Sequence, residues 1–397
     1  MSLMFGGYQD KLPVLLRTIA EKMASYDEVT AHTFSLVHTV HLRNARSVAK
    51  TSQPHAQAAQ FEARALMKSS CTGAELLEKV EALTREKLSG VNRKLLDSCY
   101  TELLLQGNYA ESEVADVLNA LLPALRPAKI LSALPAQAVG RLRGGPRSCV
   151  LLRQEGTNPD EKNSAVIVTL QAAEESLPNI TLAELAAQVL SQRCFDELRT
   201  KQQLGYIVQC SAFSNSFGAG FCGLKVIVQS EKHPAEVHRR IDTWLAAALA
   251  GLVDEAESSN EKLQEYVESL LARKREKPKK LQEEFGMNWG EVQRRFFRFT
   301  RQEEVIAFLE RPHGDLLPEF RAFVRDRLIL APRFAVEILG GTAKNACAEA
   351  SAEGGSSPDV AHYECEGLER LESIEDIDRF KEHLVWCESN VAIDAGA

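Results

Sequence analysis

The sequence predicts an α+β protein of two similar domains, each a mostly antiparallel sheet covered by helices. Its 397 residues exceed what one ordinary hydrophobic core accommodates. Long segments with apolar residues at helical spacing alternate irregularly with short β-branched runs, which indicates helices packed on a sheet. A Pro- and Gly-rich stretch predicts the boundary between a helix-rich first domain, 1–145, and a strand-richer second domain, 146–397.

The first domain is predicted to be mainly helical. Leu12, Leu16 and Ile19 fall on one helical face and predict the first helix. Further helices are expected over Asp27–Val48, from Pro54, from Thr72, from Thr84 and over Val114–Leu122. One buried strand is expected at 100–105, where an apolar run ends at turn residues. With one strand against so many helices, this domain should be incomplete at its N-terminus, and the missing strands should belong to another polypeptide segment.

The second domain should contain most of the strands. β-Branched and apolar runs bounded by turn residues predict strands at 149–153, 165–170, 205–212, 221–229 and 334–339. Helices are expected from Thr181 to the mid-190s, from Pro234, around 263–271 and from the capping box at Ser373 and Asp376. The segment 345–358 has the Ala, Glu, Gly and Ser content of a linker.

Composition excludes several classes of protein. A net charge of −8 argues against nucleic-acid binding, which needs a basic surface. No apolar run reaches the roughly 18 residues of a membrane span, so we expect a soluble protein without a membrane partner. Nine cysteines, an odd number without a CxxC pair, indicate reduced thiols. We expect a cytoplasmic location, with mitochondria or peroxisomes as alternatives, and see no targeting signal at the start of the chain.

One segment carries the clearest functional signal. RTKQQLGYIV, Arg199–Val208, resembles a segment of the insulysin-type zinc peptidases of the pitrilysin family. Shorter stretches resemble the same family in the same order, at 7–16, 53–55, 106–108, 223–234 and 277–281. The resemblance covers nearly the whole chain as the C-terminal half of such an enzyme.

The resemblance implies a role for two side chains. Members of the family are built from four similar domains that close around a peptide-sized chamber, and their C-terminal half presents an Arg and a Tyr to the scissile peptide. At the matching positions these are Arg199 and Tyr206. Phe195 lies four residues before Arg199, so it would share the helical face of Arg199 and would line a substrate side-chain pocket. A guanidinium can donate a fork of hydrogen bonds to substrate, and a phenol can donate to an oxyanion. Without the resemblance, an Arg and a Tyr at such positions would more often be structural.

The zinc motif of the family is missing from this sequence. Family members hold zinc with HxxEH, and no two of the nine His residues here are four apart. We therefore expect zinc to be bound by the N-terminal half of the enzyme, with none bound by this chain. The chain alone should be inactive, with the zinc-bearing half and peptide substrates as its partners and a homo-oligomer as a further alternative.

A basic run forms a second candidate site. Lys277, Lys279 and Lys280 correspond to a polyanion-binding wall of insulysin, which makes them candidates for contact with ATP or another anion. The simpler alternative is that these cations lie at a helix end and are solvated. No phosphate-binding loop of the GxxxxGK[ST] type is present to specify a nucleotide.

Two functions remain in competition at this point. The first is the C-terminal half of a zinc metalloendopeptidase that degrades short peptides, supplying substrate-binding and transition-state residues. The alternative is a non-catalytic scaffold or binding subunit of a pitrilysin-family hetero-oligomer. Retention of both Arg199 and Tyr206 favours the enzyme, because a scaffold has no evident need for that pair.

Overall fold

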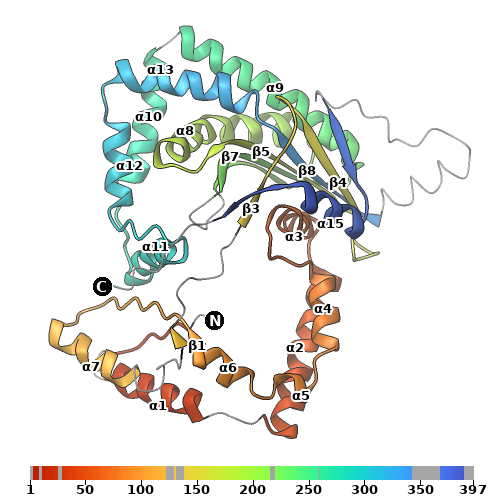
Figure 1. Cartoon of the computed structure of the whole chain (residues 1–397). Coiled ribbons are helices and arrows are strands. Elements are labelled where there is room, and N and C mark those ends of the chain that lie inside the picture. The colour runs from red at the N-terminus through yellow and green to blue at the C-terminus, as the bar shows by residue number, and fades with distance from the viewer. Residues whose placement is uncertain are drawn as a thin grey trace, which may run out of the picture.

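A six-stranded mixed sheet forms the centre of the protein (Figure 1). The computed structural model describes residues 3–8, 11–25, 29–121, 129–130, 138–214, 220–258, 260–341 and 367–388. The strand order is β6-β7-β5-β8-β4-β9. These strands are β4 (Cys149–Glu155), β5 (Ser164–Glu174), β6 (Ile207–Ser214), β7 (Phe221–Ser230), β8 (Arg333–Leu339) and β9 (Leu368–Leu371).

The pairing of the strands agrees with the predicted α+β class. β6–β7, β7–β5 and β5–β8 are antiparallel, whereas β8–β4 and β4–β9 are parallel. All five strands predicted for the second domain are present. The sheet is nevertheless more mixed than expected, because the C-terminal β9 adds to it in parallel.

The larger core lies between one face of the sheet and a layer of helices (Figure 1). This layer contains α8 (Leu177–Cys194), α9 (Pro234–Ser258), α10 (Asn260–Lys274), α12 (Arg301–Leu309) and α13 (His313–Phe323). Leu185, Ile241 and Phe320 are fully buried in it. The periodic apolar residues that predicted α9 and α10 form their buried faces.

A smaller core covers the opposite face of the sheet. Here α3 (Pro54–Leu66), from the helix-rich first third of the chain, packs beside α15 (Ile374–His383). The predicted capping box is present, because the Ser373 side chain accepts from the backbone of Asp376 and the Asp376 carboxylate accepts from that of Ser373. The strands β3 (Ala138–Arg141) and β10 (Val385–Glu388) pair with each other at the rim.

The remaining elements of the first third are helical. They are α1 (Leu12–Ser25), α2 (Ala31–Thr51), α4 (Gly73–Glu81), α5 (Arg85–Leu88), α6 (Val91–Asp97), α7 (Glu111–Leu121) and the two-residue strands β1 (Ser98–Cys99) and β2 (Lys129–Ile130). The strand predicted at 100–105 is wrong, because this segment pairs with no strand among the described residues and Leu105 instead packs with Leu12 and Leu16. α2 contains no buried residue, and its apolar residues Leu36, Val37 and Val48 are exposed.

Some expectations fall outside the described residues. They include most of the Pro- and Gly-rich stretch before 138 and the whole predicted linker 345–358. The domain boundary near residue 145 stays a prediction. Within the described ranges, no helix is long and apolar enough to cross a membrane.

Candidate functional site

The candidate site begins where helix α8 changes its winding. α8 runs directly into the π-helix η1 (Phe195–Lys201). The Gln202 N–H donates to the carbonyl of Glu197 at 2.9 Å, an i→i−5 bond that widens the last turn. Such wide turns are rare in proteins, and those that occur are often found at functional sites. Leu198 is fully buried, so the turn is anchored while its polar side chains face outward.

The chain then reverses into β6 over a few residues. Gln203 has φ +51°, a left-handed conformation that costs energy for a residue with a side chain. Gly205 does not share this left-handed conformation, and a glycine is needed there because the backbone approaches β7 closely. A Cβ at Gly205 would lie 1.8 Å from the carbonyl oxygen of Gln229 on β7. β6 accordingly starts at Ile207 rather than at Gly205.

This reversal brings the three predicted side chains together. The Arg199 guanidinium carbon lies 4.6 Å from the ring centre of Phe195 and 4.6 Å from that of Tyr206, so it is stacked against both rings. Phe195 is 39% exposed and Tyr206 is 82% exposed. Cation–π contacts of this kind contribute about 0.5–1 kcal/mol each at exposed positions. The stack orients the guanidinium while leaving the phenol in solvent.

The acidic side chains of η1 are engaged elsewhere. Glu197 accepts hydrogen bonds from Lys201 at 3.0 Å and from Gln202 at 3.1 Å. Asp196 accepts from Gln192 at 2.9 Å. Within the described part of the chain, no carboxylate forms an ion pair with Arg199. Its hydrogen-bond donors are therefore available to a ligand carbonyl or carboxylate.

The basic run lies on a different segment. Lys277, Lys279 and Lys280 are all exposed and occupy the connection between α10 and α11 (Leu281–Gln293). Lys279 forms an ion pair with Glu276 at 2.9 Å. The structure thus joins Phe195, Arg199 and Tyr206 into one cluster and leaves the lysines apart from it in the fold.

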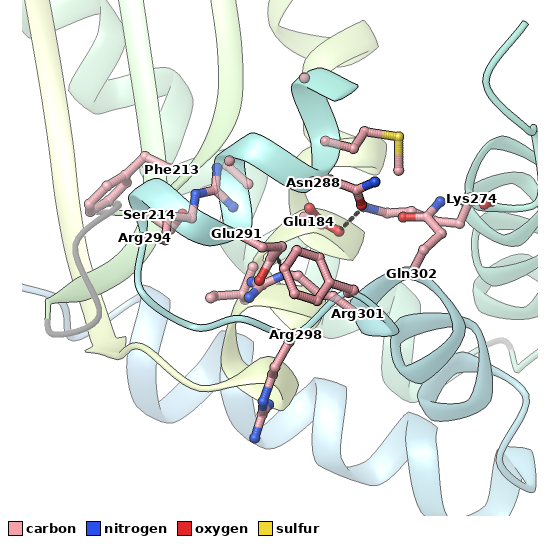
Figure 2. Close-up of a pocket in the computed structure, with 16 residues that line it drawn as sticks. Glu184, Phe213, Ser214, Lys274, Asn288, Glu291, Arg294, Arg298, Arg301 and Gln302 are labelled. Carbon is pink, nitrogen blue, oxygen red and sulfur yellow. Dashed lines mark hydrogen bonds and ion pairs between the residues drawn. The ribbon is translucent and has the colours of Figure 1, made fainter. Parts of the chain in front are cut away.

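Two features escaped the sequence analysis. One is a cavity of about 560 Å³ at the end of β6 (Figure 2). It is lined by Phe213, Arg294, Arg298 and 13 further residues, most of them from α8, α10, α11 and α12. The dense arginines between 294 and 301 were the sequence signal for it. The other is a buried charged network around His238. Among the described residues, no group of three or more His, Cys, Asp or Glu side chains is arranged to hold a metal ion.

Two protein-family models and several known proteins match this chain. Residues 1–79 match the middle or third domain of peptidase M16, and residues 185–289 match the C-terminal lobe domain 4 of the PqqF-like PQQ synthases. Human insulin-degrading enzyme is 30% identical over 314 residues, which are 78% of this chain and 30% of the human protein. These matches relate the chain to the M16 peptidases. The predicted resemblance to insulysin-type peptidases is confirmed.

Other M16 proteins extend the match. The insulin-degrading enzyme of Drosophila melanogaster is 28% identical over 388 residues, 94% of this chain and 36% of the fly protein. The chain therefore spans about a third of the length of these M16 relatives. The crystal structure of pitrilysin superposes with a TM-score of 0.71 at 16% identity, covering 97% of this chain and 38% of pitrilysin. That likeness shows the fold.

Proposed function

We propose that the chain is the C-terminal half of a zinc metalloendopeptidase and grips the peptide while the N-terminal half supplies the metal. The observation that carries this proposal is the stack of Arg199 between Phe195 and Tyr206. A tyrosine that is 82% exposed contributes little to a core, and a guanidinium without an acidic partner is ready to bind one. Both properties suit a substrate-facing surface.

Each side chain in the stack has a chemical role in this proposal. Arg199 donates hydrogen bonds to a carbonyl of the bound peptide and holds it in place. The Tyr206 hydroxyl donates to the oxyanion that develops on the attacked carbonyl. Phe195 offers an apolar wall to a substrate side chain. The two rings fix the guanidinium before substrate arrives, which reduces the ordering cost of binding.

The metal belongs to another segment in this proposal. M16 relatives are zinc peptidases, and zinc in such enzymes polarises the carbonyl and activates water. The described residues do not form a zinc site. The roles of this chain are therefore to bind and orient the peptide and to stabilise the oxyanion.

The exposed lysines are proposed to bind an anion such as ATP or another polyphosphate. Lys277 and Lys280 form no ion pair within the described residues, whereas Lys279 is partly neutralised by Glu276. We place the protein in a reducing compartment, the cytoplasm first, because the described cysteines are all free thiols.

Reconstitution tests the proposal. The chain is combined with its N-terminal half, and cleavage of a fluorogenic peptide is followed. Tyr206→Phe should lower kcat by about a hundredfold with little change in KM, as loss of an oxyanion donor does. Tyr8→Phe is the matched control, since Tyr8 is also a highly exposed tyrosine. Unchanged kcat in Tyr206→Phe would remove the catalytic role and favour the non-catalytic binding subunit.

A further inference from the structure

β6 is an open edge of the central sheet. Among the described strands it pairs only with β7, in a regular register from Ile207 opposite Gln229 to Ser214 opposite Cys222. Within the described residues, no backbone hydrogen bond reaches its other side. Proteins usually protect such edges with Pro, Lys, bulges or covering segments, and β6 contains none of these residues or irregularities. An unprotected edge is a template for an added strand.

The two ends of β6 are both marked by unusual side chains. Tyr206 immediately precedes the strand and carries the Arg199 stack. Ala212, Phe213 and Ser214, at the other end, line the cavity of about 560 Å³. That volume lies within the usual range of ligand pockets. The edge therefore connects the proposed substrate-gripping stack with a hollow that can accept a side chain.

The charge of this cavity is unevenly compensated. Arg301 lies 3.7 Å from Glu291, and Lys274 lies 2.7 Å from Glu184. Arg294 is half-buried, and its guanidinium has no hydrogen bond or ion pair to any described residue. In Figure 2, Arg294 lies on the same side of the cavity as Phe213 and Ser214, whereas Arg298 extends away from them. An acidic group would compensate Arg294.

The α11 side of the cavity includes two glycines. Gly286 and Gly290 lie four residues apart in α11 and both line the cavity. A Cβ added at either would meet nothing within 4 Å. Glycine is among the least favourable residues inside a helix. The two glycines therefore leave this side of the cavity open at a cost in helix stability. Because space is open beside both glycines, a larger side chain at either position can fill the cavity without disturbing the fold.

We propose that a bound peptide lies along β6 as an added β-strand, with an acidic group of the peptide in the cavity beside Arg294. This inference rests on the proposed function, because it starts from the peptide residue held at Tyr206. From Tyr206 to Phe213 the strand rises roughly 24 Å, and an added strand has the same rise. The acidic group should therefore lie about seven residues from the residue held at Tyr206. The substrates selected are extended peptides with an acid at that spacing.

N-methylation of the peptide backbone tests the added strand. A fluorescently labelled peptide with one glutamate is bound to the full chain, and each backbone N–H is methylated in turn while fluorescence polarisation is measured. Alternate N–H groups of an added strand point toward β6, so every second methyl group should weaken binding roughly tenfold and the intervening ones little. Equal effects at all positions would overturn the proposal.

The acidic site is tested by moving the glutamate along the peptide. Binding should be strongest at one spacing and should weaken roughly tenfold when the glutamate becomes glutamine. Arg294→Gln and Gly290→Leu should both abolish this preference. Their controls are Arg273→Gln, at an exposed arginine of α10, and Gly251→Leu, at a helical glycine that also faces open space. A preference that survives both cavity variants would overturn the assignment of the cavity.

The outcomes separate this inference from the proposed function. If Arg199→Ala weakens peptide binding but methylation shows no period of two, the peptide is gripped without following β6. If Arg199→Ala leaves binding unchanged while the period of two is present, the edge binds peptide and the stack does not. In the first case the inference is wrong, and in the second the proposed function is wrong.

Discussion

His238 Nδ1 lies 2.9 Å from Glu337 Oε1 in the core between α9 and β8, and neither side chain is reached by solvent. The pair belongs to a larger charged network. Asp242 lies 3.6 Å from His238 and 2.9 Å from Arg333, and Arg153 lies 2.7 Å from Glu337. Burying charges is costly, and the network offsets this cost only because each carboxylate meets a cation. This network ties α9 to the centre of the sheet that carries β6.

The stability of the protein should depend on pH through this pair. Burial lowers the pKa of His238, but the charges of Asp242 and Glu337 outweigh it and the pKa is raised. Burial raises the pKa of Glu337, but the hydrogen bond from His238 and the charge of Arg153 outweigh it and lower the pKa to about 2. The stability from Glu337 is present above its unfolded pKa of about 4.3 and is lost as the pH falls toward 2. The stability from His238 is complete below about pH 6.5 and is lost as the pH rises through its folded pKa.

Urea denaturation over a pH series checks this expectation. The free energy of unfolding should be greatest between about pH 4.5 and 6.5 and decline on both sides. His238→Gln should flatten the decline on the alkaline side. An alkaline decline of the same slope in His238→Gln would show that another group causes it.

Removing the Glu337 carboxylate by mutation should lower the free energy of unfolding more than deprotonating His238 at high pH. Glu337→Gln leaves His238 and Arg153 without their shared anion, which should cost about 3 kcal/mol of unfolding free energy. Glu155→Gln, at the exposed end of β4, serves as the control and should change stability little. Equal stabilities of the two variants would contradict the importance of the network.

Local sequence rules predicted the elements whose stability is local. The apolar period of α9 and the capping box at Ser373 both depend on nearby residues, and both are present. The strand at 100–105 failed because an apolar run becomes a strand only beside another strand, which no local rule supplies. α11 and α13 were missed because Gly286 and Pro318 argue against helices, and tertiary packing overrides that preference.

Some features of the candidate site could be predicted from the sequence and others could not. Arg199 and Tyr206 came from the resemblance of one continuous segment, and the spacing of Phe195 from Arg199 correctly indicated their contact. The reason for Gly205 could not be read from the sequence, since the clash it avoids involves Gln229 on another strand. The arginines between 294 and 301 were a local signal, but the sequence alone could not predict the cavity beside Arg294, because its walls come from segments far apart in the chain.

The exposed lysines should bind polyphosphate through charge alone. Lys277→Gln combined with Lys280→Gln should weaken binding of inorganic triphosphate by about five- to tenfold at low ionic strength. The difference should disappear at high salt, because exposed charges are screened. Isothermal titration calorimetry at two salt concentrations measures this. Lys232→Gln, at a half-buried lysine 3.9 Å from Glu236, is the control, and equal weakening by it would indicate nonspecific attraction.

Cys194 should be chemically inert in the folded protein although it adjoins the Arg199 segment. Its side chain is fully buried, and burial raises the pKa of its thiol to about 12. The thiolate is the reactive form, so iodoacetamide at neutral pH should leave Cys194 unmodified while it labels the half-buried Cys71. Mass spectrometry of digested protein reads out both sites. Rapid native labelling of Cys194 would show that η1 opens far more readily than its packing indicates.

Gly205 should be required for placing Tyr206 correctly. In Gly205→Ala the new Cβ would meet the Gln229 carbonyl at 1.8 Å, so the start of β6 must move away from β7. We expect a loss of about 2 kcal/mol in unfolding free energy and, in the reconstituted enzyme, a kcat lowered toward that of Tyr206→Phe. Gly251→Ala is the matched control: its Cβ meets open space inside α9, and the change should raise stability by up to about 1 kcal/mol. The backbone shift that destabilises the start of β6 also displaces Tyr206. If Gly205→Ala lost stability but kept full kcat, the position of Tyr206 at the start of β6 would therefore not matter for the reaction.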